Sequence, residues 1–198
     1  MKKARKIRKS NKLILKLMII SIISVLIGIF YIAILSNSNK VLIKENLETY
    51  FESLNKLNYI KALIKCLTSN MITISSIWLL GISIIGVFLI IIILIIKSFA
   101  LGFTISSLIY VYKLKGIIIS IIYIIPLIIN LFVIIILSYY GIIFSKNLNR
   151  LLFLKKDVNF KNIMRKYIKI LLFSTICIVI SSLIEIYIVP NILKLLQI

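Results

Sequence analysis

Hydrophobic residues in this chain are gathered into long runs that only short polar segments separate. The runs lie at about residues 13–35, 71–112, 116–144 and 167–189. A helix that crosses a bilayer needs ~20 mostly apolar residues, because the hydrocarbon core is ~30 Å thick and each residue adds ~1.5 Å. The pattern therefore predicts membrane-spanning helices and not the core of a soluble domain.

The run at 71–112 is too long for one crossing. As a single helix it would extend ~63 Å, about twice the membrane thickness. Lys97 is its only charged residue, so we expect the chain to reverse at Lys97-Ser98. The second of the two resulting spans is short, and it either crosses fully or re-enters the side it came from.

The first run follows a basic tail, as the apolar segment of a signal peptide does. It is longer than the usual ~7–15 apolar residues, and no A-x-A-like cleavage site follows it, so we interpret it as a retained span. The predicted fold is an all-α polytopic transmembrane bundle in a single integral membrane domain, 1–198, with about five spans: 13–35, 71–96, 98–112, 116–144 and 167–189.

Composition agrees with a membrane protein, since 62% of the residues are hydrophobic against ~45–50% in soluble domains. The net charge of +20, from 25 Lys and Arg against 5 Asp and Glu, would also fit nucleic-acid binding. The basic residues lie at the ends of the apolar runs, however, which is typical of topology signals. We therefore expect no nucleic-acid partner.

Two basic segments predict the topology. The tail 1–12 and the loop 145–166 are both rich in Lys and Arg, and such segments stay in the cytoplasm. An even number of crossings must then separate them, which favours a full crossing at 98–112 and places the C-terminus outside. The basic loop also suits anionic lipid at the cytoplasmic face.

The polar segment 36–70 is expected to be an extracytoplasmic loop. It opens with a helix stop at 36–39, and apolar residues then recur at helical spacing in 42–54 and 57–67. Two amphipathic helices that lie on the membrane or against the bundle are expected, with Ser69 or Asn70 capping the next span. Partner docking and simple surface packing are both open for this loop.

Catalytic motifs are missing from this sequence, which has no Walker motif, no G-x-S-x-G and no CxxC. It has no histidine, which excludes His-based zinc sites and Ser-His triads. Cys66 lies in the polar loop and Cys177 in a span, so no disulfide is expected. Three loop glutamates share their segment with lysines and form a solvated helix face instead of an acid/base pair: Glu45, Glu48 and Glu52. We predict no enzyme activity, catalytic residue, metal, cofactor or small-molecule substrate.

Glu185 is the only acidic residue inside a predicted span. Buried intramembrane charges are costly and are functional candidates by default. Glu185 follows Ser181 by four residues, which places both on one helix face, and Lys113 and Lys115 are candidate counter-ions. A structural polar contact and a partner-binding or gating role are both open.

Small residues recur every fourth position in the span 98–112, at Ser98, Gly102 and Ser106. This spacing allows close helix approach, and Gly81 and Gly86 are expected to receive that face within the chain, in preference to homodimerisation.

Pro126 removes a backbone donor from the span 116–144 and is expected to kink it. Asn130 lies one turn later and is expected to satisfy a neighbouring polar group.

Several of these motifs together resemble the stage II sporulation protein M family of endospore-forming bacteria. The resembling segments are Ser69-Asn70, Ile77–Gly86, Lys97-Ser98, Leu101–Thr104, Pro126, Ser181–Glu185 and Pro190. Two departures are Ser98, where the family often has glycine, and the apolar pair Leu127-Ile128 directly after the proline.

The resemblance implies a non-enzymatic scaffold in the mother-cell septal or engulfing membrane. Its implied partners are membrane-anchored cell-wall hydrolases resembling stage II sporulation proteins D and P, which cut peptidoglycan during engulfment of the forespore. The alternative function is transport, as a permease or channel subunit whose path is lined by Ser83, Thr104, Ser120 and Asn130. An intramembrane enzyme is the third possibility.

Overall fold

The computed structural model describes the backbone of residues 2–55, 59–83, 85–152 and 160–195, and the side chains of 12–49, 59–83, 85–151 and 160–193. Its elements are all helical across those ranges, so the predicted all-α bundle is confirmed. They are α1 (Lys2–Ile34), α2 (Asn37–Asn55), α3 (Tyr59–Ile82), α4 (Gly86–Leu152), α5 (Phe160–Leu183), the π-helical turn η1 (Ile184–Ile188) and α6 (Val189–Leu195).

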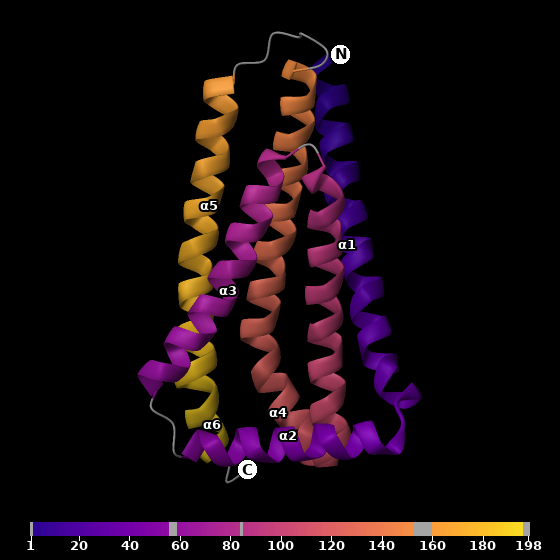
Figure 1. Ribbon diagram of the computed structural model, residues 1–198, viewed down its shortest axis with the longest axis vertical. Helices are drawn as coiled ribbons and strands as arrows, with labels where there is room; N and C mark the ends of the chain where they lie inside the picture. Colours follow the sequence, from indigo (N-terminus) through magenta and orange to yellow (C-terminus); the bar gives the residue numbers. More distant parts are fainter. Residues whose placement is uncertain (1, 56–58, 84, 153–159, 196–198) are drawn as a thin grey trace.

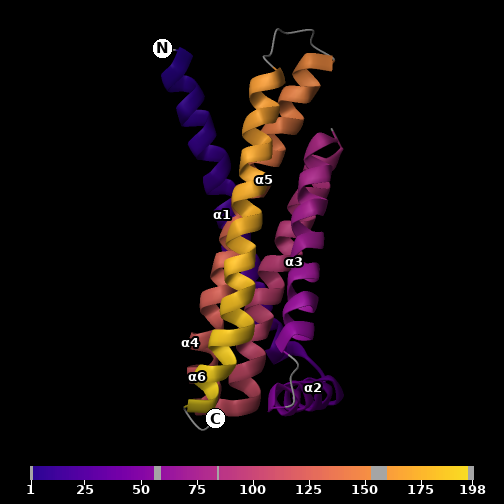
Figure 2. The same cartoon turned by 90° about the vertical axis from the view of Figure 1, so that its left-hand side faces the viewer.

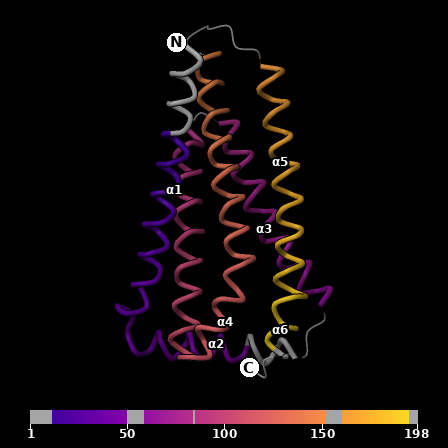
Figure 3. Tube along the Cα trace, turned by 180° about the vertical axis from the view of Figure 1, so that it is seen from behind, coloured from indigo at the N-terminus to yellow at the C-terminus, as the bar shows by residue number. Residues whose placement is uncertain are grey.

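The helix α4 is a hairpin. Its backbone leaves the helical region at Lys113, where φ is 52° and ψ is −122°, and Figure 1 shows its two limbs, 86–112 and 114–152, running in opposite directions. The chain descends in α1, crosses the lower end in α2, ascends in α3, turns through α4 and descends in α5. The two termini therefore lie at opposite ends of the bundle (Figures 1 and 3).

Four helical segments are long and apolar enough to cross a membrane: Lys12–Ile34, Tyr59–Ile82, Gly86–Leu151 and Phe160–Leu193. Because α4 folds back at Lys113, it passes along the bundle twice.

The expected reversal at Lys97-Ser98 is wrong, because both residues lie inside the first limb of α4. The expected spans 71–96 and 98–112 are replaced by α3, which ends at Ile82, and by the limb that begins at Gly86, so the chain reverses between these two residues. Gly86 permits this turn, since a Cβ there would overlap the carbonyl oxygen of Leu80. A single lysine does not break a helix, because its long side chain can carry the charge toward the interface.

The segment 59–70 is also helical and begins α3, so neither Ser69 nor Asn70 caps a helix. The expected second flat helix is therefore the start of an ascending one. Residues 56–58 and the side chains of 50–55, Glu52 among them, lie outside the described part of the chain.

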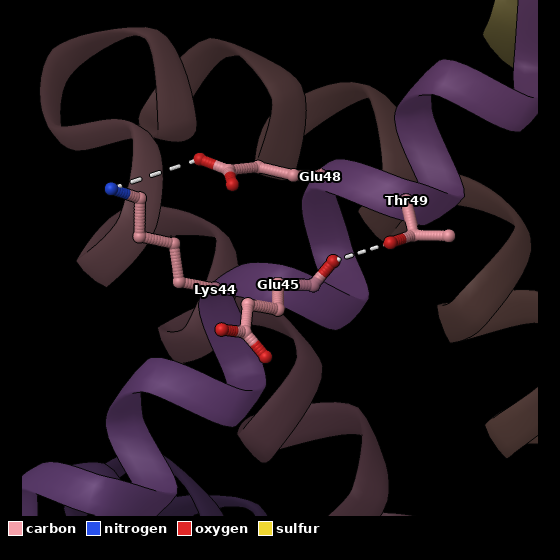
Figure 4. A network of polar contacts seen from close by, with 4 residues as sticks. All are labelled: Lys44, Glu45, Glu48 and Thr49. Carbon is pink, nitrogen blue, oxygen red and sulfur yellow. Dashed lines mark hydrogen bonds and ion pairs between the residues drawn. The ribbon is translucent and has the colours of Figure 1, made fainter.

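The helix α2 lies across the lower end of the bundle, where Figure 2 views it nearly end-on. Leu47 packs against a cluster formed by Leu108, Ile119, Tyr123, Val189 and Leu193. Its charged face is exposed and bonded within the helix: Lys44 lies 3.8 Å from Glu48, and Thr49 donates to the Glu45 carbonyl at 2.8 Å (Figure 4). This matches the expected solvated helix face.

Glycines set the contact between α1 and α4. A Cβ at Gly102 would overlap the carbonyl oxygen of Val25, and one at Gly28 would overlap that of Phe99. The expectation that Gly81 and Gly86 receive Gly102 is therefore wrong. The hydroxyls of Ser98 and Ser106 do not bridge two helices, because they donate to backbone carbonyls of their own helix.

A second close crossing joins α3, α4 and α5 toward the N-terminal end of the bundle. A Cβ at Gly81 would lie 3.0 Å from the Cα of Gly141. The Tyr167 hydroxyl donates to the Trp78 carbonyl at 2.9 Å, and its ring stacks on Phe144 with centroids 4.6 Å apart. The core beneath this crossing is formed by isoleucine, leucine and valine, with Ile77, Ile90, Leu94 and Leu137 fully buried.

Candidate functional site

Glu185 lies in η1, toward the end of the bundle where α2 and α6 lie (Figure 1). Its partly buried carboxylate faces α3, where the Cys66 thiol donates to Oε2 at 3.4 Å. A thiol is a weak donor, and an ionised carboxylate has about four acceptor positions. Toward the described residues, the carboxylate therefore keeps most of its accepting capacity.

Two further polar side chains join this contact. The amide Nδ2 of Asn70 lies 3.5 Å from the Cys66 sulfur and 3.4 Å from the Ser182 oxygen. Glu185, Cys66, Asn70 and Ser182 form the polar cluster, which links α3 to the end of α5 and to η1. It is a row of hydrogen-bonding groups between α3 and the C-terminal part of α5 with η1.

The polar cluster contains no cation from the described part of the chain. Lys113 and Lys115, the expected counter-ions, form no ion pair with Glu185; the ion pair found among the described side chains joins Lys44 and Glu48. An intramembrane carboxylate usually has a partner charge or strong donors. Among the described side chains Glu185 has one weak donor, so the site can accept a further cation or strong donor.

Glu185 faces α3 together with Ser182, which lies three residues earlier on the same helix face, and it lies in a π-helical turn. A π-helix closes its hydrogen bonds at i→i+5 and thereby inserts an extra residue into the turn. Ser181 precedes this turn and points at α4, where its hydroxyl donates to the Pro126 carbonyl at 2.9 Å. Ser181 and Glu185 thus contact different helices, α4 and α3 respectively. Such π-turns are frequent at functional sites.

Pro126 and Asn130 lie on the second limb of α4. The non-helical dihedrals of α4 occur at Lys113 and not at Pro126. The Asn130 Oδ1 atom is buried and accepts no hydrogen bond from the described residues. Asn130 is expected to form a hydrogen bond with a neighbouring polar group, and its Oδ1 atom forms none with the described residues.

An aromatic contact supports the same helix junction two turns before Cys66, on the same face of α3. The rings of Tyr59 and Tyr187 stack with centroids 5.5 Å apart and planes 13° apart. Tyr59 begins α3 and Tyr187 lies in η1. The polar cluster is thus held between two helices that a ring stack also fixes.

The sequence pointed to Glu185 but missed Cys66 and Asn70 as its neighbours. The sequence pattern places Cys66 in a loop and Asn70 at a helix cap. Their four-residue spacing places them on one face once α3 is extended back to Tyr59, and that extension was the missing signal.

The chemistry available here is hydrogen bonding and charge. No group of three His, Cys, Asp or Glu residues in the described segments is placed to hold a metal ion. Cys66 and Cys177 are both free thiols. The cluster can therefore accept hydrogen bonds or a cation. Its geometry is suited to binding a group that supplies either one.

Comparison with known proteins gives one match. The family model described as stage II sporulation protein M matches residues 17–190, most of the chain. No curated protein and no solved structure matches the chain. The matched range includes every residue of the polar cluster and both crossings set by glycines.

Proposed function

The chain belongs to the stage II sporulation protein M family, and on that premise we propose that this sporulation-related membrane protein is a non-enzymatic scaffold. It would hold peptidoglycan-degrading enzymes in the septal membrane of the mother cell while that membrane engulfs the forespore. The partners would be membrane-anchored hydrolases resembling stage II sporulation proteins D and P.

The observation that carries this proposal is that Glu185 has no cation or strong donor beside it among the described side chains. Its carboxylate is partly buried between α3 and η1 with the Cys66 thiol as its hydrogen-bond donor. Leaving such a group without a strong partner in a bilayer costs free energy. A lysine, arginine or amide from a partner helix would supply that donor.

The position of α2 supports the same role. It crosses the end of the bundle opposite the N-terminus (Figure 1), and its face with Lys44, Glu45 and Glu48 is exposed. With the N-terminus in the cytoplasm, as the basic segments predict, α2 lies on the side where peptidoglycan is cut. Partners would then contact α2 and the Glu185 side of the bundle together.

Co-purification tests the proposal. Glu185→Gln keeps the shape of the side chain and removes its charge, while Glu45→Gln makes the same change on the exposed face of α2. We expect Glu185→Gln to reduce recovery of the hydrolases and to delay engulfment, and Glu45→Gln to leave both unchanged. If the hydrolases co-purify with Glu185→Gln at the wild-type level and engulfment proceeds normally, Glu185 does not bind them.

A transport role has less support. Two of the polar residues expected to line a path donate to backbone carbonyls, Thr104 to Ala100 at 2.9 Å and Ser120 to Ile105 at 3.4 Å. These contacts favour packing over a path. Solute flux through vesicles that contain the protein alone would reverse this preference.

A further inference from the structure

One face of α5 carries positive charge at its start and apolar side chains along the rest of its length. Lys161, Arg165 and Lys169 follow one another at four-residue steps and are exposed. Steps of three and four residues stay on one helix face. The exposed residues that continue this face are Leu172, Ile176, Val179, Ile180 and Leu183. We call these eight residues the α5 stripe.

The opposite face of α5 packs into the bundle. Tyr167, Ser174, Ile178 and Ser181 are nearly or fully buried there. The α5 stripe therefore points away from the other helices and faces the acyl chains when the bundle lies in a bilayer. Its three cations lie where the helix leaves the hydrocarbon.

The charge around this end is one-sided among the described side chains. Lys146, Arg150 and Lys166 are exposed near the start of α5, and Figure 1 shows the end of α4 beside it. The described acidic residues, Glu45, Glu48 and Glu185, belong to α2 and η1 at the other end of the bundle. No described carboxylate thus neutralises the cations of the α5 stripe.

We propose that the α5 stripe binds an anionic phospholipid. The phosphate is held by Arg165 and Lys169 with Lys161 beside them, and an acyl chain lies along the apolar part of the stripe. From Lys169 to Leu183 the helix rises ~21 Å, which exceeds the ~15 Å depth of one leaflet. Arginine and lysine both bind phosphate oxygens by charge-assisted hydrogen bonds.

The continuity of the stripe favours a lipid over a nucleic acid. Its ligand must offer a phosphate group and an apolar chain in line with each other, and a nucleic acid offers only the first. Each cation near an anionic surface contributes about 1 kcal/mol, which corresponds to about fivefold in affinity.

Native mass spectrometry of the purified full-length protein, titrated with phosphatidylglycerol or phosphatidylcholine, tests the proposal. We expect the wild type to prefer phosphatidylglycerol. The double variant Arg165→Gln/Lys169→Gln should bind it about 25-fold more weakly, while its affinity for phosphatidylcholine stays the same. Unfolding followed by the fluorescence of Trp78, the single tryptophan, checks that the double variant is folded.

The matched control is Lys61→Gln/Lys65→Gln on α3, which also removes two exposed cations four residues apart. Polar residues, Thr68 and Ser69, follow this pair of lysines on α3. Apolar residues follow Lys169 at the corresponding positions of α5. The control should stay within about twofold of the wild type, and Arg165→Lys/Lys169→Arg should bind like the wild type. An equal loss in the control, an unchanged preference in the double variant, or displacement of the lipid by short duplex DNA would each overturn the proposal.

Discussion

The hydroxyl of Ser181 on α5 donates a 2.9 Å hydrogen bond to the carbonyl oxygen of Pro126 on α4. Both residues are buried, and 55 positions of sequence separate them. Pro126 has no backbone N–H of its own, so it weakens the hydrogen-bond ladder of its helix. The Ser181 contact ties that weakened stretch of α4 to α5, three residues before η1 begins.

Ser181→Ala should therefore destabilise the bundle modestly. Hydrogen bonds between membrane helices contribute about 0.6 kcal/mol on average and about 1.7 kcal/mol at most. We expect a loss in this range in thermal unfolding of the protein in detergent. Thr175→Ala is the control, because the Thr175 hydroxyl donates within its own helix to Leu171. An equal effect of both substitutions would show that the link to Pro126 adds no stability.

The two glycines that meet between α3 and α4 should respond differently to alanine. A Cβ at Gly81 would overlap the Tyr167 hydroxyl and lie 3.0 Å from the Gly141 backbone. At Gly141 the nearest atom would be the flexible Ile90 Cδ1, at 3.1 Å. Gly81→Ala should cost about 1–3 kcal/mol by overpacking, and Gly141→Ala should cost less.

Thermal unfolding of both glycine variants measures this difference. Gly81→Ala should also displace Tyr167 from the Trp78 carbonyl and change the tryptophan emission. If Gly141→Ala lowers the unfolding temperature more than Gly81→Ala does, the packing around Gly81 is looser than the 3.0 Å approach to Gly141 implies.

The composition and the lengths of the apolar runs were enough to predict an all-α membrane bundle. They were not enough to place its turns. Lys97 looked like a boundary because it is the only charge in a long apolar run, yet it continues a helix. The real turns depend on Gly86 and Lys113, whose roles come from the close approach of Leu80 and from a positive φ. Neither feature leaves a hydropathy signal.

The candidate site could be predicted only in part, for a similar reason. Glu185 was found from its charge, since an acidic residue in an apolar span is rare. Its contact with Cys66 depends on a helix that starts earlier than the polar composition of 59–70 suggests. Periodicity relates residues of one helix and does not tell which residues of another helix lie opposite, so it did not place Glu185 beside Cys66.

Replacing Lys113 with glycine should stabilise the folded protein. Its φ of 52° and ψ of −122° lie in a region that only glycine adopts without strain, and such strain costs about 1–3 kcal/mol. Lys113→Gly should therefore stabilise the protein by about 1 kcal/mol. Lys115→Gly, the control two residues later in helical conformation, should destabilise it by a similar amount. If the two variants shift the unfolding temperature in the same direction, the hairpin does not turn at Lys113.

The positions of the two turns can be read directly by cysteine labelling. Ile85 and Leu114 are 78% and 80% exposed, whereas Ser98 is fully buried. In a Cys66→Ser/Cys177→Ser background, Ile85→Cys and Leu114→Cys should react with a membrane-impermeant maleimide from opposite sides of the membrane. Ser98→Cys should not react until the protein is denatured, because it lies inside a packed helix. With the N-terminus in the cytoplasm, only Leu114→Cys should be labelled in intact cells. Labelling of Ser98→Cys together with protection of Ile85→Cys would instead support a reversal at Lys97-Ser98, and would place the first limb of α4 and all its contacts with α1 in doubt.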